Sequence, residues 1–248
     1  MMTKRLDGKV ALITGATRGI GAGVAKALAR EGAHIILTGR TTGALEEMDD
    51  AVRELGAETT LVPMDLQDFD AIDRLGGHVA EIWGRLDILV GNAGILGPIS
   101  PLGHISPKEW EKLMAINVTA NYRLLRSFDP LLKAAEAARA VFVTSTVAED
   151  CRAYWGGYAT TKAALNCMVK TYALEVANVT SIRANILNPG PIRTNMRAAA
   201  MPGEDPDTLD TPDDIAPLFV KMCLPQFQQN GRIISYKDYK AGVYGEIF

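Results

Sequence analysis

Three side chains suited to proton transfer lie close together in the middle of the sequence. Ser145 precedes Tyr158 by thirteen residues, and Lys162 follows in Tyr158-Ala-Thr-Thr-Lys162. On a helix, a tyrosine and a lysine four residues apart project from the same face. A free phenol has a pKa near ~10, and an ammonium about 4 Å away favours its ionised form by on the order of 4 kcal/mol at a dielectric near ~20, before desolvation. The spacing therefore predicts general acid–base chemistry at Tyr158.

The elements that must position these residues alternate along the chain. Short aliphatic runs, typical of strands covered on both faces, predict strands at 10–14, 34–38, 60–62, 86–90, 140–146, 182–187 and 232–235. Stretches with helical spacing lie between them, at 19–30, 42–55, 71–83, 107–135, 158–177 and 212–222. This alternation predicts one α/β domain over residues 1–248, a doubly wound Rossmann-type parallel sheet of seven strands with helices on both faces. Ser145 would end the fifth strand at the ligand-binding edge of the sheet.

A glycine-rich turn follows the first predicted strand, in Thr14-Gly15-Ala-Thr17-Arg18-Gly19-Ile20-Gly21. In a dinucleotide site, Gly15 would permit a tight turn, Gly19 would let the backbone approach a pyrophosphate, and Gly21 would allow close helix–strand packing. The N-terminus of the following helix offers free N–H groups to an anion. The position of the glycine-rich turn between a strand and a helix favours dinucleotide binding over a turn that merely connects the two elements.

The end of the second predicted strand indicates which dinucleotide is bound. An acidic residue at this distance from the glycine turn would bind the ribose diol and repel a 2′-phosphate. Here Gly39 is followed by Arg40, and Arg18 lies within the glycine turn. Two guanidinium groups near the ribose favour a phosphate, so we expect NADP(H) as the cofactor. The alternative is that Arg40 is a solvated residue after a strand.

Composition narrows the function class. The 248-residue chain has 26 Lys and Arg against 29 Asp and Glu, a formal net charge of −3. Binding to nucleic acid requires a clustered basic excess, so we expect no nucleic-acid partner. Cys151, Cys167 and Cys223 are too few and too scattered for a disulfide framework or a zinc site, so we expect no metal and a cytoplasmic location. The longest uncharged run, 88–107, is broken by Gly and Pro, which argues against a membrane span.

Taken together, these motifs resemble the short-chain dehydrogenase/reductase family, from about residue 8 to residue 235. The family's active-site positions match Asn117, Ser145, Tyr158 and Lys162. The resemblance implies that the cofactor is bound by Gly15, Thr17, Arg18, Gly19, Ile20, Gly21, Arg40, Asp65, Leu66, Asn92, Ala93, Gly94, Tyr158, Lys162, Pro189, Gly190, Ile192 and Thr194. In this set Asp65 would contact adenine, and the segment from Pro189 to Thr194 would meet the nicotinamide.

The resemblance also implies a role for each active-site residue. Tyr158 would donate a proton to a substrate carbonyl in reduction, or remove one from an alcohol in oxidation. Lys162 would hold the ribose hydroxyls and lower the pKa of the phenol. Ser145 would bind the carbonyl oxygen and stabilise its developing charge. Asn117 would hold a water in a proton relay.

The expected activity is hydride transfer between NADP(H) and a small or medium ketone or secondary alcohol. A 3-oxoacyl thioester reductase is the alternative enzyme. A protein that senses NADP without catalysis would be expected to lack part of the active-site set, whereas all four residues are present here. The segment Trp155-Gly-Gly-Tyr158, with Met196–Pro202 and Glu204-Asp-Pro, resembles a bacterial subgroup of uncharacterised oxidoreductases within the family.

Two segments depart from common family patterns. Thioester-reducing members usually end the last strand with Val-Asp-Gly-Gly, whereas this chain has Gly231-Arg-Ile-Ile-Ser-Tyr236. The tyrosines of the atypical segment 231–248 would pack in a subunit contact or lie across the active site. Residues 193–211 are rich in Pro, Gly and acids, and we expect a mobile substrate loop there.

Several other residues leave two interpretations open. His104 and Trp155 would touch substrate or pack, and Arg152 and Arg193 would bind an anionic group or be solvated. The run Thr211-Pro212-Asp213 favours a helix cap over a metal site. The predicted helices at 107–135 and 158–177 carry more apolar surface than the sheet can cover, so we expect a homodimer or homotetramer.

Overall fold

Seven parallel strands organise the molecule. The computed structural model describes residues 4–245, so residues 1–3 and 246–248 of the predicted 1–248 domain lie outside the described residues. Within this part of the chain, the strands form one sheet in the order β3-β2-β1-β4-β5-β6-β7. They are β1 (Val10–Thr14), β2 (His34–Gly39), β3 (Thr59–Pro63), β4 (Ile88–Gly91), β5 (Arg139–Val143), β6 (Arg183–Asn188) and β7 (Ile233–Ser235). The doubly wound fold expected from the sequence is confirmed.

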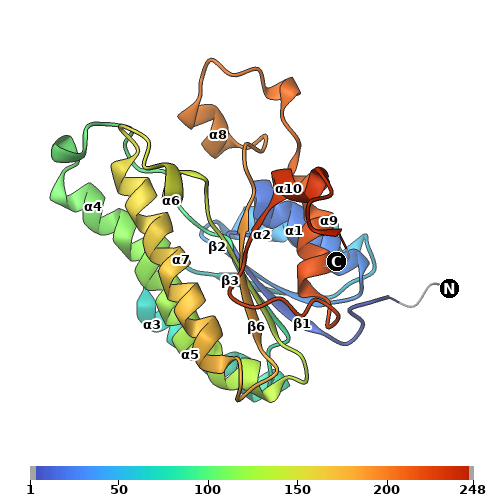
Figure 1. Ribbon diagram of the computed structural model, residues 1–248. Helices are drawn as coiled ribbons and strands as arrows, with labels where there is room; N and C mark the ends of the chain where they lie inside the picture. The colour runs from blue at the N-terminus through green and yellow to red at the C-terminus, as the bar shows by residue number, and fades with distance from the viewer. Residues whose placement is uncertain (1–3, 246–248) are drawn as a thin grey trace.

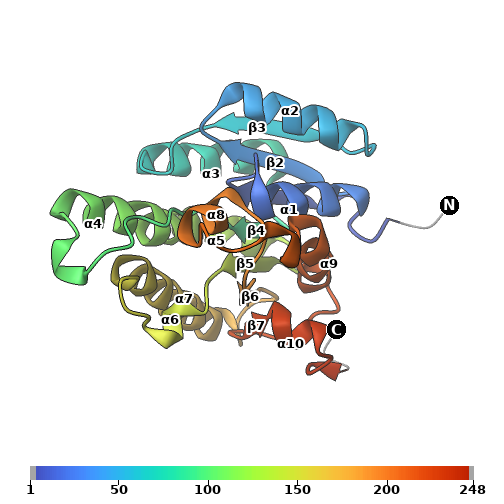
Figure 2. The same ribbon diagram turned by 90° about the horizontal axis from the view of Figure 1, so that it is seen from above.

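Helices cover both faces of the sheet (Figure 1). On one face lie α1 (Gly19–Arg30), α2 (Thr42–Arg53) and α9 (Pro212–Cys223). On the other lie α3 (Phe69–Trp83), α5 (Ala120–Ala134) and α7 (Gly156–Val176), and α4 (Pro107–Met114) leads into α5. Figure 2 shows these two layers on either side of the strands. None of the helices described in residues 4–245 combines the length and apolar character needed to cross a membrane.

The central strands are aliphatic because both of their faces are covered. Every residue of β1 is buried, and successive side chains enter opposite cores. Ala11 and Ile13 pack with α1, α2 and α9, whereas Val10 and Leu12 pack with α3, α5 and α7. Alternation of this kind holds the strand ends in a fixed register, which positions the turns that follow them.

Two elements differ from the sequence prediction in ways that concern the site. The predicted strand 140–146 ends at Val143, and the chain then turns into the short helix α6 (Val147–Asp150), so Ser145 lies beyond the strand. The predicted helix 107–135 is interrupted by a π-helical turn, η2 (Ala115–Thr119). The side-chain amide of Asn121, in the first turn of α5, donates to the backbone carbonyl of Asn117 in this turn at 2.9 Å. Widened turns of this type recur at functional sites.

The segment 193–211 contains two helical turns that the sequence analysis did not predict. These are α8 (Asn195–Ala200) and η3 (Pro206–Thr208). The Thr194 side chain caps α8 by accepting from the Arg197 N–H at 3.1 Å, and Arg197 in turn pairs with Glu204. The segment returns to its start, since Ile192 and Asp210 form a β-bridge. The predicted cap at Thr211 is confirmed, with Pro212 in the first turn of α9.

The atypical C-terminal segment forms α10 (Tyr236–Lys240) beside that bridge. Lys240 Nζ contacts both carboxylate oxygens of Asp210, at 2.6 and 2.9 Å. Tyr236 is buried, and the Tyr244 hydroxyl accepts from the Ser235 N–H at 2.7 Å. In the described part of segment 231–248, these tyrosines therefore pack against their own subunit; residues 246–248 lie outside the described residues.

Gly21 gives a test of the packing between α1 and the strand ends. A Cβ atom at Gly21 would lie 2.2 Å from the Gly15 carbonyl oxygen and 2.6 Å from Asn92 Nδ2. We expect Gly21→Ala to lower the free energy of unfolding by on the order of 3 kcal/mol, measured by denaturant unfolding. Gly77→Ala is the control, because no atom lies within 4 Å of its Cβ. That change should stabilise α3 by up to about 1 kcal/mol, and equal effects of the two substitutions would contradict the packing argument.

Candidate active site

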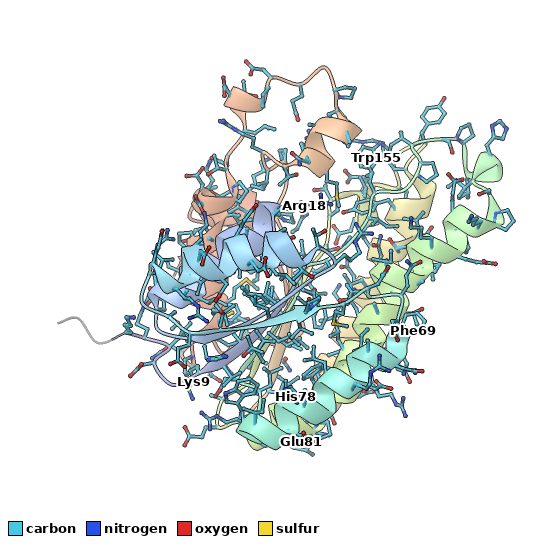
Figure 3. The ribbon with its side chains drawn as sticks, turned by 180° about the vertical axis from the view of Figure 1, so that it is seen from behind. Lys9, Arg18, Phe69, His78, Glu81 and Trp155 are labelled. Atoms are coloured by element: carbon cyan, nitrogen blue, oxygen red, sulfur yellow. The ribbon has the colours of Figure 1, made fainter. Side chains whose placement is uncertain are left out.

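A cleft of about 800 Å³ opens at the carboxyl ends of the strands. The strand order reverses between β1 and β4, and doubly wound sheets bind ligands at this point. Turns that follow β1, β2, β3, β4, β5 and β6 all contribute residues to the cleft. Figure 3 shows Arg18 and Trp155 at the end of the molecule that carries α8, with Lys9, His78 and Glu81 at the opposite end.

The glycine turn and the end of β4 are joined by hydrogen bonds. Asn92 Nδ2 donates to the carbonyls of Thr14 and Gly15 at 2.9 and 3.3 Å. The Thr14 hydroxyl accepts from the N–H groups of Asn92 and Ala93 at 3.0 and 3.1 Å. Gly15 has a φ of +64°, a value that favours glycine. These bonds hold the two turns together at the floor of the cleft.

One end of the cleft fits a dinucleotide phosphate. The N-terminus of α1 has no side-chain cap, so its first N–H groups are open to an anion. Gly19 has a φ of +54°, and a Cβ atom there would lie 3.3 Å from the Thr194 methyl group. Arg18 and Arg40 are exposed and line the cleft, and neither forms an ion pair with the described residues. Two cations beside an open helix N-terminus suit a ligand with several phosphates.

The other half of the cleft contains the predicted proton-transfer residues. Ser145, Tyr158 and Lys162 all line it, Ser145 from the turn after β5 and the other two from α7. Lys162 Nζ lies 5.6 Å from the centroid of the Tyr158 ring and donates to the Val143 carbonyl at 2.8 Å. The two side chains share one face of α7, as their spacing predicts, and both are buried.

Burial controls the protonation of this pair. It raises the pKa of Tyr158 to about 12 and lowers the pKa of Lys162 to about 8. The sequence argument expected the lysine to lower the pKa of the phenol, and the structure shows the opposite direction. The reason is that removal from water penalises the phenolate and the ammonium alike. Tyr158 is therefore a protonated donor at neutral pH.

Asn117 lies behind the cleft, in the π-helical turn, and is fully buried. Its side chain accepts from the Ile95 N–H and donates to the Ile95 carbonyl, each at 2.9 Å, and it also donates to the Thr161 hydroxyl at 3.0 Å. It thus ties the loop after β4 to α7. A Cβ atom at Gly94 would lie 3.2 Å from Asn117 Oδ1 and 3.5 Å from Lys162 Nζ, so glycine leaves space between the two.

The structure brings most of the predicted site residues to one cleft. Of the predicted set, Asn117 and Gly21 do not line it, and both pack immediately behind it. The sequence analysis missed other residues that line it, among them Thr144, Met196 and Ala200. Thr144 Oγ1 is buried without a hydrogen-bond partner within the described residues. A threonine at a strand end carries no spacing signal, and only its position in the cleft identifies it.

The structure places each residue that the sequence left with two interpretations. Trp155 is buried and lines the cleft, with its ring 6.3 Å from that of Tyr158. The Arg152 guanidinium lies 5.8 Å from the centre of the Trp155 ring. Arg193 pairs with Asp207 at 3.2 Å. His104 is exposed and does not line the cleft.

Comparisons with known proteins agree with this geometry. Residues 9–205 match the family model described as short chain dehydrogenase. An uncharacterized oxidoreductase, YciK of Escherichia coli strain K12, is 37% identical over 218 residues, which span 87% of this chain and 86% of the relative.

Two solved structures are similar to this chain over most of the length of both proteins. A putative short chain dehydrogenase from Pseudomonas syringae has a TM-score of 0.91 and 38% identity, covering 94% of this chain and 96% of the other. One from Shigella flexneri, complexed with NADP, has a TM-score of 0.90 and 34% identity, covering 95% and 99%.

The family match spans most of the chain, and the relative and both structures exceed 30% identity. The protein therefore belongs to the short-chain dehydrogenase/reductase family of oxidoreductases.

Proposed function

We propose that this protein is an NADP(H)-dependent carbonyl reductase or alcohol dehydrogenase, with Tyr158 as the general acid and base. Its substrate is a small or medium ketone or secondary alcohol. The observation that carries the proposal is that one cleft is lined by Arg18 and Arg40, which suit a phosphate, and by Ser145 and Tyr158, which suit proton transfer. A bound nicotinamide supplies the hydride in reduction and accepts it in oxidation.

The preference for NADP(H) is inferred from charge at the end of β2. Gly39 stands where an acidic side chain would repel a 2′-phosphate, and Arg40 follows it. A guanidinium forms charge-assisted bonds to phosphate that an uncharged ribose hydroxyl cannot match. The complex of the Shigella flexneri relative with NADP supports the same inference.

Proton transfer is assigned to Tyr158 and Ser145. With its pKa raised to about 12, the phenol is protonated at neutral pH and is ready to donate to a carbonyl oxygen in reduction. In oxidation the same oxygen takes the proton from an alcohol. The Ser145 hydroxyl, half-buried beyond the end of β5, donates a hydrogen bond to the substrate oxygen and stabilises its developing charge.

Lys162 and Asn117 are assigned to proton supply and positioning. Lys162 binds the ribose hydroxyls and, with its pKa lowered to about 8, exchanges a proton readily near neutral pH. Asn117 is assigned to a relay through a bound water in the space that Gly94 leaves open. Its side-chain bonds to Ile95 fix the wall of that space.

The proposal includes a homodimer, or a tetramer built from it, formed through α5 and α7. These helices expose Tyr122 on α5 and Leu174 on α7, with Val179 just beyond α7. A groove of about 510 Å³ lies between them. Exposed apolar side chains around a groove favour association with a second copy.

Replacement of the phenol tests the proton-transfer role. Tyr158→Phe should lower kcat/KM for NADPH-dependent ketone reduction by roughly 10²- to 10⁴-fold, because it removes the proton donor. The affinity for NADPH, measured by its fluorescence, should stay close to that of the wild type. Tyr154→Phe is the control, since Tyr154 is 59% exposed. Turnover by Tyr158→Phe equal to that of the control would exclude the mechanism.

Charge reversal at the end of β2 tests cofactor choice. Arg40→Asp should lower the ratio of kcat/KM with NADPH to that with NADH by about tenfold or more, because a charge-assisted bond of about 1.5–3 kcal/mol is replaced by repulsion. Arg30→Asp, in the last turn of α1, changes the net charge equally without lining the cleft. The two ratios are compared in steady-state assays. An unchanged ratio in Arg40→Asp would contradict the NADP(H) preference.

The pH dependence of stability tests the burial of Lys162. Between pH 8 and pH 10.5 the unfolded chain binds a proton at this side chain that the folded protein does not. Stability therefore rises with pH in this range, by up to about 3 kcal/mol. Denaturant unfolding of cofactor-free protein at pH 8 and pH 10 should show a change in stability that is more positive in the wild type than in Lys162→Met, because buried Cys223, whose pKa is raised to about 12, opposes the rise equally in both proteins. Exposed Lys170 provides the control, as Lys170→Met should keep the change seen in the wild type. Equal slopes in all three proteins would contradict the assignment.

A further inference from the structure

We propose that the substrate is an uncharged carbonyl or alcohol compound whose hydrocarbon part lies against Trp155, Leu96 and Ala200. This inference rests on the proposed function and narrows its substrate class. It excludes substrates that carry a carboxylate or phosphate near the reacting carbon. Two independent observations support it, the apolar wall around Tyr158 and the pairing of the arginines that line the cleft.

The wall around Tyr158 is apolar on several sides. Val147, Trp155 and Ala159 are buried with Tyr158 in one cluster, and Leu96, Ala200 and Met201 pack against it. These residues come from the loop after β4, from α6, from the start of α7 and from α8. The Trp155 and Tyr158 rings are tilted by 60°, with their centres 6.3 Å apart. A substrate whose oxygen reaches Tyr158 therefore places its carbon skeleton against aliphatic and aromatic surface, which favours a hydrocarbon group.

Within the described residues, the charged side chains that line the cleft on the substrate side include no unpaired cation. The charged residues of the whole cleft are Arg18, Arg40, Asp65, Lys162, Arg193 and Arg197. The first three follow β1, β2 and β3, on the side assigned to the cofactor. Lys162 donates to the Val143 carbonyl beneath Tyr158. Arg193 and Arg197 therefore remain as the cations that a substrate could meet.

Each of these two arginines is already paired with an acid of its own segment. Arg197 Nε and Nη2 bind the two carboxylate oxygens of Glu204 at 2.6 and 2.5 Å, a bidentate pair in which both side chains are 24% exposed. This pairing holds the pKa of Glu204 below its usual range, so the carboxylate is ionised at neutral pH. Arg193 pairs with Asp207. An anionic substrate would have to displace Glu204 or Asp207 to reach a guanidinium.

The segment that covers the cleft also carries an excess of negative charge. Residues 193–211 contain two arginines and four carboxylates, of which Asp210 pairs with Lys240 of α10. Arg152 lies over the Trp155 ring and is not among the residues that line the cleft. None of the four carboxylates lines the cleft, so the segment presents to a substrate only two arginines that already bind Glu204 and Asp207.

Two ketones of the same skeleton test the inference. 4-Methylacetophenone carries a methyl group where 4-acetylbenzoate carries a carboxylate. With NADPH, we expect kcat/KM to be about tenfold or more higher for the methyl compound, because the carboxylate meets an apolar wall and arginines that already bind Glu204 and Asp207. Glu204→Gln should bring the two values closer by raising that of 4-acetylbenzoate, because it frees the Arg197 guanidinium. Glu149→Gln removes an exposed charge of α6 and should leave the ratio as in the wild type.

Binding measurements separate failure of this inference from failure of the proposed function. Saturation-transfer NMR of the NADPH-loaded protein reports whether each ketone binds, whatever its turnover. Binding of 4-methylacetophenone in preference to 4-acetylbenzoate, without oxidation of NADPH, would support the inference and overturn the reductase function. Faster turnover or tighter binding of 4-acetylbenzoate would overturn the inference and leave the function standing. Failure of 4-methylacetophenone to bind, or equal ratios in Glu204→Gln and Glu149→Gln, would also overturn the inference.

Discussion

The side-chain amide of Asn92 lies at the point on which the whole site depends. It donates to the carbonyls of Thr14 and Gly15, and these bonds join the ends of β1 and β4 where the strand order reverses. The close approach requires Gly21, because any Cβ atom there would overlap the Gly15 carbonyl. The dinucleotide end and the proton-transfer end lie on opposite sides of this junction, so its geometry fixes their separation.

Burial then determines the pKa values of the two side chains at the substrate end of the cleft. Tyr158 and Lys162 lie on the inner face of α7, where removal from water keeps the phenol protonated and makes the ammonium easy to deprotonate. In an exposed pair of the same residues, the phenol would lose its proton at a lower pH and the ammonium would keep its proton to a higher pH. The apolar cluster that contains Trp155 is part of the cause, because it excludes water from the phenol. The same residues therefore set both the acid–base state and the shape of the substrate end.

The features that could be predicted from the sequence are those that depend on the spacing of residues close together in the chain. The glycine turn, the Tyr158–Lys162 face and the Thr211 cap follow from residues close together in the chain, and the aliphatic runs determine the order of strands and helices. The sequence did not predict α8 or the pair of Arg197 with Glu204, because these depend on the path of a segment without periodicity. Nor did it predict the π-helical turn at Asn117, whose side chain bonds a loop 22 residues away in sequence. The expected fall in the pKa of Tyr158 failed because burial cannot be read from spacing.

The bridge between Ile192 and Asp210 affects how the substrate selectivity of the cleft can change. Because the two ends of the intervening stretch bridge each other and Asp210 also pairs with Lys240 of α10, the length of the stretch can change without disturbing the register of the sheet. The residues at the carboxyl ends of the strands are thus held independently of the segment between Ile192 and Asp210. Insertions, deletions or grafts beyond Arg197 would alter the residues around the cleft while Thr194 and the glycine turn stay in place.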